Sequence, residues 1–216
     1  MLLSDRILFI DAEAIVIDKP AGLPVDTPRR GGASVVSRLD ELRAGFKRLP
    51  TPMHRLDTDT SGCLLLARSP KARGAFQRAF EAREIEKYYL AIVAGDVSGE
   101  EGTIDIPLAK TSSAEAGWRM VGDPEGQKAI THWRRIAIRD GRTLVEFRPV
   151  TGLTHQIRAH AREAFGSGIA GDRVYGVPGG PMLLHASRLV VPRPAKPTID
   201  VTAPLPDYFG EWPDAA

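Results

Sequence analysis

The 216-residue sequence has a single cysteine, Cys63, no long hydrophobic run and no large excess of either charge. One cysteine cannot form an internal disulfide and cannot supply the usual four-ligand zinc site. No apolar run approaches the roughly 20 residues that a membrane-spanning helix needs, and the N-terminal residues do not have the pattern of a signal peptide. The net charge of +2 neither requires nor excludes a polyanionic partner. We therefore expect a cytoplasmic protein without zinc fingers or membrane contact.

The remaining composition is that of a globular protein, with 43% hydrophobic and 26% charged residues. A chain of this length can bury a core of its own, and we expect one domain over residues 1–216. The 21 glycines and 17 prolines favour many short elements joined by turns and argue against a helical bundle.

Strand-like segments dominate the pattern. They cover residues 7–10, 14–17, 63–67, 89–93, 103–108, 130–138, 144–150 and 183–191. Helical spacing follows Ser34 and the capping pair Ser69-Pro70. The segment 151–160 begins a further helix, after the strand that ends near Val150. Because strands and helices do not alternate regularly, we predict an α+β fold with a mixed, mostly antiparallel sheet and flanking helices. We expect residues 111–127, with Trp118 and Arg119, to form a long exposed loop, and the tail 199–216 to lie on the surface.

Polar and turn-forming residues gather at positions 54–62, directly before the apolar run at Cys63. Loops at strand ends are favoured places for reactive side chains. From local physics alone, a turn in which Asp57, Asp59 and Ser61 cap backbone amides explains the segment equally well.

A second polar cluster covers residues 151–160. Arg158 follows His155 by three positions, so both can face the same side of a helix, and a guanidinium there can hold a carboxylate ionised. A structural arginine on a helix surface is the alternative. His155 and His160 are five residues apart and do not share a helix face, so we expect no metal site.

A third cluster holds Tyr88 and Tyr89 on one predicted strand. Successive strand residues point to opposite faces, so the two rings meet different environments. A strand tyrosine most often packs in the core.

Together these segments resemble the RluA family of pseudouridine synthases. The motifs that carry the resemblance are Asp18-Lys19-Pro20-Ala21-Gly22, His54-Arg55-Leu56-Asp57 with Thr60-Ser61-Gly62, Lys87-x-Tyr89-x-Ala91, Thr151-Gly152-x-Thr154-His155-Gln156-Ile157-Arg158-x-His160 and Leu184-His185-Ala186. They occur in order from about residue 7 to about residue 206. The resemblance implies the pseudouridine synthase fold, with two halves around a central catalytic cleft, and a single catalytic domain without the N-terminal RNA-binding domain that family members often carry.

The resemblance also implies the roles of individual residues. Asp57 is the expected catalytic aspartate, Tyr89 the tyrosine that stacks on the uracil, and Arg158 the basic partner of Asp57. The expected RNA contacts are Arg55, which in the family can fill the gap left by a flipped nucleotide, and His54, Thr60 and His155. Leu153 departs from the arginine that is common in the family between Gly152 and Thr154.

The implied reaction isomerises uridine to pseudouridine in a stem-loop of ribosomal or transfer RNA. It involves no net redox change or hydrolysis, so we expect no cofactor and no metal. We expect RNA as the partner, no protein partner and a monomer. The sequence leaves open whether Asp57 attacks covalently or abstracts a sugar proton to give a glycal.

Two other functions are alternatives to this one. Asp57 and Asp59 invite comparison with a carboxylate-pair glycosidase, but aromatic residues, which line sugar clefts, make up only 6% of the chain. A non-catalytic RNA-binding module needs only basic and exposed segments. Retention of the aspartate, tyrosine and arginine positions argues against binding alone.

Overall fold

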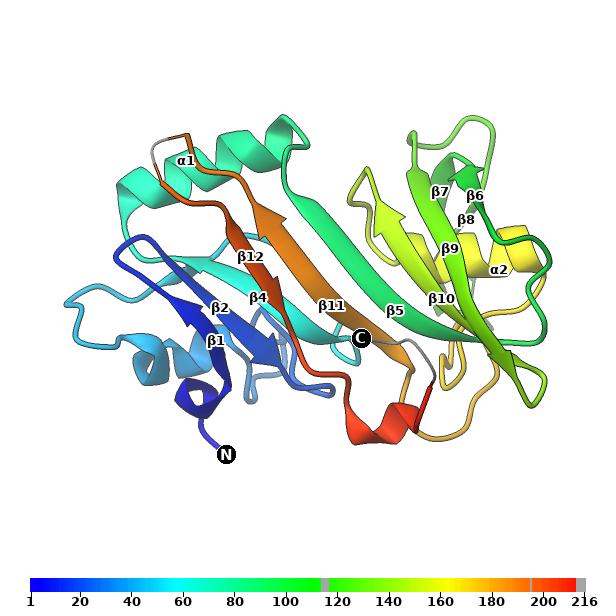
Figure 1. Cartoon of the computed structure of the whole chain (residues 1–216), viewed down its shortest axis with the longest axis horizontal. Helices are drawn as coiled ribbons and strands as arrows, with labels where there is room; N and C mark the ends of the chain where they lie inside the picture. The colour runs from blue at the N-terminus through cyan, green and yellow to red at the C-terminus, as the bar shows by residue number, and fades with distance from the viewer. Residues whose placement is uncertain (114–116, 195, 213–216) are drawn as a thin grey trace. The chain divides into compact units, whose positions relative to one another are not determined.

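The computed structural model describes residues 1–113, 117–194 and 196–212. They form two compact units, the first made of Met1–Lys87 with Ala186–Pro204 and the second of Tyr88–His185 with Leu205–Ala216. Each unit contains antiparallel strand pairs and helices (Figure 1). The expected α+β class with a mixed, mostly antiparallel sheet and the pseudouridine synthase fold is confirmed.

The first unit is built on the strand order β1 (Ile7–Ile10), β2 (Ala14–Lys19), β4 (Ser61–Ala67) and β11 (Leu184–Val191). The short β3 (Thr51–Pro52) pairs with β4, and β12 (Ile199–Thr202) pairs with β11. Every residue of β2 and β4 is buried, which explains why the sequence has apolar runs at residues 14–17 and 63–67 within these strands.

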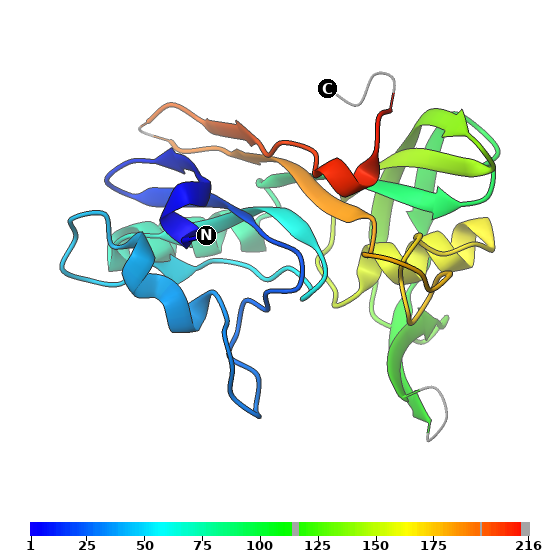
Figure 2. The same cartoon turned by 90° about the horizontal axis from the view of Figure 1, so that it is seen from below.

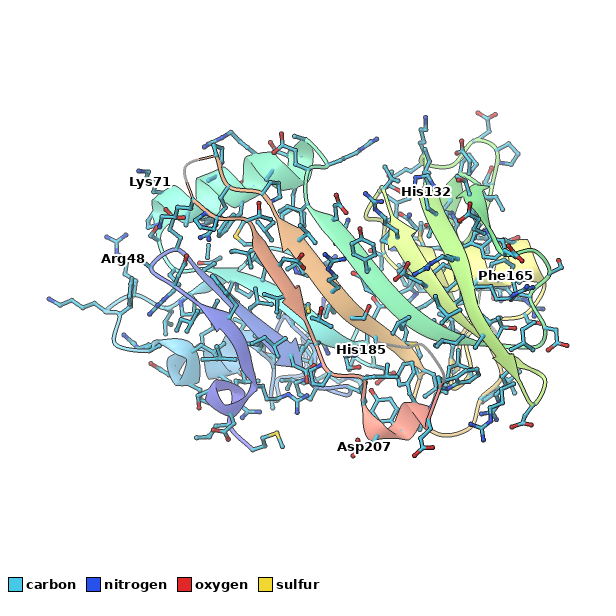
Figure 3. The ribbon with its side chains drawn as sticks, viewed as in Figure 1. Arg48, Lys71, His132, Phe165, His185 and Asp207 are labelled. Carbon is cyan, nitrogen blue, oxygen red and sulfur yellow. The ribbon has the colours of Figure 1, made fainter. Side chains whose placement is uncertain are left out.

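Helix α1 (Pro70–Glu81) packs on this sheet (Figure 1). As predicted, Ser69 caps it, with its side chain accepting a hydrogen bond from the backbone N–H of Ala72. Ala72, Phe76 and Ala79 are buried against strand residues, whereas the basic side chains of the helix face solvent. Lys71 is one of these, and Arg48 is exposed on a loop of the same unit (Figure 3).

The helix expected after Ser34 is a short 3-10 helix, η2 (Val36–Leu42), and a second one, η1 (Leu3–Arg6), precedes β1. Leu39 and Leu42 are spaced by three residues and are both buried, which suits three residues per turn. Ala44 and Gly45 both have positive φ, so the chain turns there and the helical pattern does not reach Phe46.

The second unit has the strand order β5 (Glu86–Ala94), β10 (Arg142–Pro149), β9 (Ile130–Arg139) and β6 (Glu101–Asp105). Helix α2 (Gln156–Phe165) follows β10, and a one-turn 3-10 helix, η3 (Asp207–Phe209), lies near the end of the chain. The predicted strand 103–108 is divided, because β6 ends at Asp105 and a new strand begins at Leu108.

The expectation of a long loop over residues 111–127 is wrong. β7 (Leu108–Ser113) and β8 (Gly117–Gly122) form a hairpin, which projects beside α2 in Figure 2; residues 114–116 lie outside the described residues. Leu108 and Met120 are buried against Ala159 and Tyr175. The serines, glycines and alanines of this segment concealed the hairpin, because only alternate positions carry the apolar side chains that pack.

The expectation that the tail lies on the surface is also wrong for its first residues. Ile199 and Val201 of β12 are buried in the core of the first unit, so this segment is a structural strand. Residues 213–216 of the predicted tail lie outside the described residues. Within the described ranges, no helix is both long and apolar enough to cross a membrane. The cytoplasmic location stays a prediction.

Candidate active site

Asp57 lies in the first unit, on the segment that connects β3 to β4. The N–H of Thr60 donates to the carbonyl oxygen of Asp57 at 3.1 Å and closes a turn whose tip is Thr58 and Asp59. Leu56 and Thr60 are buried on either side, whereas Asp57 is partly exposed. Two buried anchors therefore hold a carboxylate that solvent can reach.

The side chain of Lys19 holds this turn in place through a hydrogen bond to Thr58. This side chain is fully buried, and Nζ donates to the carbonyl oxygens of Pro20 (2.9 Å), Leu23 (2.7 Å) and Thr58 (3.1 Å). Burial lowers the pKa of Lys19 to about 8, and the charges of Asp59, Asp57 and Asp18 oppose that shift. A buried lysine thus ties the turn after β2 to the residue that follows Asp57.

Gly62 fixes the other end of the segment. Its φ is +105°, and a Cβ at this position would lie 2.2 Å from the carbonyl oxygen of Ala186 on β11. No side chain fits this contact, so the Ser61-Gly62 pair permits β4 to begin directly beside β11.

His54 and Arg55 precede Asp57 in different environments. The N–H of Leu65 donates to Nε2 of His54 at 3.1 Å, and the ring contacts Phe80. Burial lowers the pKa of His54 to about 3, with the charge of Lys87 adding to the shift, so His54 is neutral at physiological pH. Arg55 is exposed, and its ion pair with Asp26 is long at 3.4 Å.

A pocket of about 420 Å³ opens beside Arg55. It is lined by Val25, Asp26, Val36, Leu39, Pro50, Thr51, Pro52, Met53, His54 and Arg55. Arg55 thus borders a largely apolar recess.

Tyr88 and Tyr89 lie at the start of the second unit, on β5. Tyr89 is buried and pairs across the sheet with Phe147 of β10, whereas Tyr88 is partly exposed, with the guanidinium of Arg148 at 5.4 Å from its ring centre. The two tyrosines have different environments, as their adjacent positions predict.

Arg158 lies on α2 in the second unit and is buried. Its Nε and Nη2 donate to the two carboxylate oxygens of Asp172 at 2.7 and 2.8 Å. Asp172 is fully buried, and burial by itself raises its pKa; hydrogen bonds from Arg158, Val174 and Tyr175 outweigh that effect and give a net lowering. This bidentate pair, made through Nε and Nη2, fixes the plane of the guanidinium.

His155 caps the N-terminal end of α2 with a positive φ of 56°. Its Nδ1 is 3.0 Å from the hydroxyl of Tyr175, and its ring meets Trp118 of β8 edge to face at 4.7 Å. The side chain therefore joins the helix, the β7–β8 hairpin and the loop that carries Tyr175.

The predicted site residues fall into two groups. His54, Arg55, Asp57 and Thr60 share the first unit, and Tyr89, His155 and Arg158 share the second. No cluster of three or more potential metal-binding side chains occurs among the described residues.

Sequence reasoning missed three residues that support these groups: Lys19, Asp172 and Tyr175. Lys19 lies in the motif Asp18-Lys19-Pro20-Ala21-Gly22, but the sequence alone indicates no role for it. The signal for Asp172 and Tyr175 was their position within a glycine-rich segment, where polar side chains often hold the backbone.

Comparison with known proteins gives one answer. The family model described as RNA pseudouridylate synthase matches residues 13–163. An uncharacterized RNA pseudouridine synthase of Zymomonas mobilis is 50% identical over 212 residues, covering 96% of this chain and 97% of that protein. The dual-specificity RNA pseudouridine synthase RluA of Haemophilus ducreyi is 35% identical over 199 residues, covering 87% and 86%.

Solved structures agree with these sequence matches. Human RNA pseudouridylate synthase domain containing 4 superimposes with a TM-score of 0.81 at 26% identity, over 96% of this chain and 91% of that one. Human RNA pseudouridylate synthase domain containing 1 gives 0.75 at 26% identity, over 92% and 82%. With a family match over more than half of its length and relatives above 30% identity along nearly all of it, the chain belongs to the RluA-type RNA pseudouridine synthases, which are isomerases acting on RNA.

Proposed function

We propose that this enzyme isomerises one specific uridine, in a stem-loop of ribosomal or transfer RNA, with Asp57 as the catalytic group. The observation that carries the proposal is the construction of the Asp57 turn. Buried Lys19 holds Thr58 by its carbonyl, Leu56 and Thr60 anchor both sides, and the Asp57 carboxylate stays accessible. Such a rigid support under an accessible carboxylate is what a catalytic group needs.

The reaction breaks the bond from ribose C1′ to uracil N1 and forms a bond from C1′ to C5; the proton on C5 moves to solvent, and N1 takes up a proton. Asp57 either attacks the nucleotide and is later released, or removes a sugar proton and returns it. Both routes require the ionised carboxylate. Neither changes the oxidation state of the RNA, so the reaction needs no external electron donor or acceptor.

Arg158 and Tyr89 are the proposed partners of Asp57. In this assignment the Arg158 guanidinium, held in plane by Asp172 through Nε and Nη2, keeps Asp57 ionised. Tyr89 supplies an aromatic face to the extruded uracil, and its hydroxyl assists removal of the C5 proton. The buried position of Tyr89 on β5, paired with Phe147 of β10, supports a fixed ring.

The uridine must leave its stack before Asp57 can reach it. Arg55 is the proposed side chain that fills the resulting gap, because it is exposed and its ion pair with Asp26 is a long, exposed contact that costs little to break. His54, Thr60 and His155 are assigned to neighbouring RNA contacts. Because His54 is neutral at physiological pH, its contribution is shape or hydrogen bonding and not charge.

Trp118 and Lys110 of the β7–β8 hairpin offer a further contact with RNA. Lys110 is exposed and lies 5.4 Å from the ring centre of Trp118. An aromatic ring and an adjacent cation suit a base and its phosphate.

The proposed target follows from charge and from relatives. With a net charge of only +2, the chain has few means of gripping a large RNA at distant points, so recognition is local. The Haemophilus ducreyi relative is named for dual specificity, and a 32% identical relative from Rickettsia bellii is named for the large ribosomal subunit. These names support transfer or ribosomal RNA as the substrate class.

Asp57→Asn tests the proposal, with Asp59→Asn as its matched control in the same turn. Transcripts of transfer RNA and large-subunit ribosomal RNA, labelled with tritium at uracil C5, are incubated with each protein, and tritium release and free uracil are measured. We expect Asp57→Asn to lose isomerisation while RNA binding remains, because the amide keeps the shape but is neither nucleophile nor base. Asp59→Asn should keep near wild-type turnover.

Three outcomes would overturn the proposal. Substantial activity in Asp57→Asn removes this residue from its role, release of free uracil identifies a glycosidase, and RNA binding by the wild type without tritium release identifies a binding module. Turnover on a minimal hairpin and on the intact RNA, at the same salt concentration, then tests local recognition. Reaction of only the intact RNA or an assembled ribosomal particle would refute it.

A further inference from the structure

Tyr175 joins three parts of the second unit. Its hydroxyl accepts a hydrogen bond from the N–H of Met120 on β8 at 2.7 Å and is 3.0 Å from Nδ1 of His155 at the start of α2. The guanidinium carbon of Arg158 lies 5.2 Å from its ring centre. The tyrosine is buried, so these contacts are made away from bulk water.

The loop that carries Tyr175 is held firmly. Oδ1 of Asp172 accepts the N–H groups of Val174 (2.8 Å) and Tyr175 (3.2 Å) in addition to its bond from Arg158. The N–H of Ala170 donates to the carbonyl of Ile92 on β5 at 2.8 Å. Gly171 has a positive φ and approaches Pro181 so closely that no side chain fits. The position of the Tyr175 ring is therefore set by the sheet.

We propose that Tyr175 is a positioning residue through which the β7–β8 hairpin sets the orientation of Arg158. The inference rests on the proposed function, in which Arg158 serves the catalytic aspartate. The ring supports one face of the guanidinium, and Asp172 holds its edge. The hydroxyl then fixes the ring to the backbone of β8, so displacement of the hairpin by a bound RNA is transmitted to Arg158.

A second anchor shows why the hydroxyl matters for this coupling. The N–H of Gly122, two residues after Met120, donates to Oε1 of Glu163 on α2 at 3.0 Å. This bond also attaches β8 to α2, but it is exposed to solvent. The Tyr175 bond is buried and connects the hairpin to a residue whose ring lies beside the guanidinium of Arg158.

Tyr175→Phe isolates the hydroxyl, because the ring and its buried volume remain. Thr143→Val is the matched control in the same unit. The Thr143 hydroxyl accepts from the N–H of Val97 at 3.0 Å and donates to Gly95, so its loss also leaves a buried amide unpaired, but at the start of β10, whereas α2 begins after the end of that strand. Each substitution removes a hydroxyl with two hydrogen-bond partners, so thermal stability should fall similarly in both variants.

The first readout is turnover on the tritium-labelled transcripts described above, well below the melting temperature. We expect Tyr175→Phe to lower kcat about tenfold with KM nearly unchanged, the size of one hydrogen-bonding contribution. Thr143→Val should keep the wild-type kcat. Equal loss of kcat in both variants, or none in Tyr175→Phe, refutes the positioning role.

The second readout needs no RNA and no activity. The Nε–H of Arg158 gives a nitrogen-15 NMR signal, assigned by its disappearance in Arg158→Lys, and its hydrogen-exchange rate reports how tightly the Asp172 pair is held. We expect faster exchange in Tyr175→Phe and an unchanged rate in Thr143→Val. If the wild type shows no tritium release, the proposed function fails while this measurement still decides the positioning role; unchanged exchange in Tyr175→Phe overturns it.

Discussion

Lys19→Met should change the pH dependence of stability in a direction that the burial of Lys19 determines. Burial lowers its pKa from the ordinary 10.5 to about 8 in the folded chain. Between these values the unfolded chain keeps the proton and the folded chain has lost it, so the wild-type free energy of unfolding rises with pH. The slope is about 1.4 kcal/mol per pH unit, which gives about 3 kcal/mol over the whole interval.

Below pH 8 both states carry the proton, and the destabilising effect of the buried charge is constant. In Lys19→Met this charge is absent, but the carbonyls of Pro20, Leu23 and Thr58 lose their donor. These two effects oppose each other at pH 7. The test therefore depends on how the difference in free energy of unfolding between wild type and variant changes with pH, and not on its value at one pH.

Denaturant unfolding of wild type, Lys19→Met and the control Lys71→Met, from pH 7 to 9.5, measures this difference. The wild type should gain about 2 kcal/mol relative to Lys19→Met between pH 8 and 9.5. Lys71 is exposed on α1, so its variant should follow the wild type at every pH. Parallel curves for Lys19→Met and wild type would show that Lys19 keeps an ordinary pKa and refute the reasoning.

Two further predictions concern β5 and β4. Tyr89→Phe should bind RNA as the wild type does but form little pseudouridine, because the ring still stacks on the base while the hydroxyl that assists proton removal is gone. Filter binding measures the RNA affinity, and pseudouridine formation measures the activity. A greater loss of activity in Tyr88→Phe than in Tyr89→Phe would mean that the strand faces are assigned wrongly. Gly62→Ala should prevent stable folding, because its Cβ meets the Ala186 carbonyl at 2.2 Å, whereas Gly22→Ala, at positive φ but in open space, should cost only about 1 kcal/mol. Thermal unfolding compares them, and similar melting temperatures would contradict the clash.

Local sequence signals predicted the elements whose stability is local or whose burial is complete. The apolar run of β4 and the Ser69 cap of α1 are examples, because each depends on neighbours within a few residues. The position of Asp57 before β4 followed from its polar, turn-forming neighbours. Its catalytic role came from the resemblance and stays a proposal.

The supporting residues depend on contacts that no local pattern contains. Lys19 reaches Thr58 across 39 positions, Arg158 reaches Asp172 across 14, and Met120 reaches Tyr175 across 55. Each side chain acquires its role only when the fold brings a distant backbone or carboxylate to it. For the same reason the β7–β8 hairpin was missed, since its apolar contacts are with α2 and the Tyr175 loop.

The division of the first unit into two chain segments has a consequence for synthesis on the ribosome. Residues 1–87 emerge first, but Leu189, Val191, Ile199 and Val201, which complete the core with α1 and β4, follow about 100 residues later. At elongation rates of about 5–20 residues per second, this delay is about 5–20 s. During that time the apolar faces of β4 and α1 lack their covering strands. The nascent chain is thus a natural client for a chaperone that binds exposed apolar segments, and the sheet that supports the Asp57 turn is completed only after residues 189–201 have emerged.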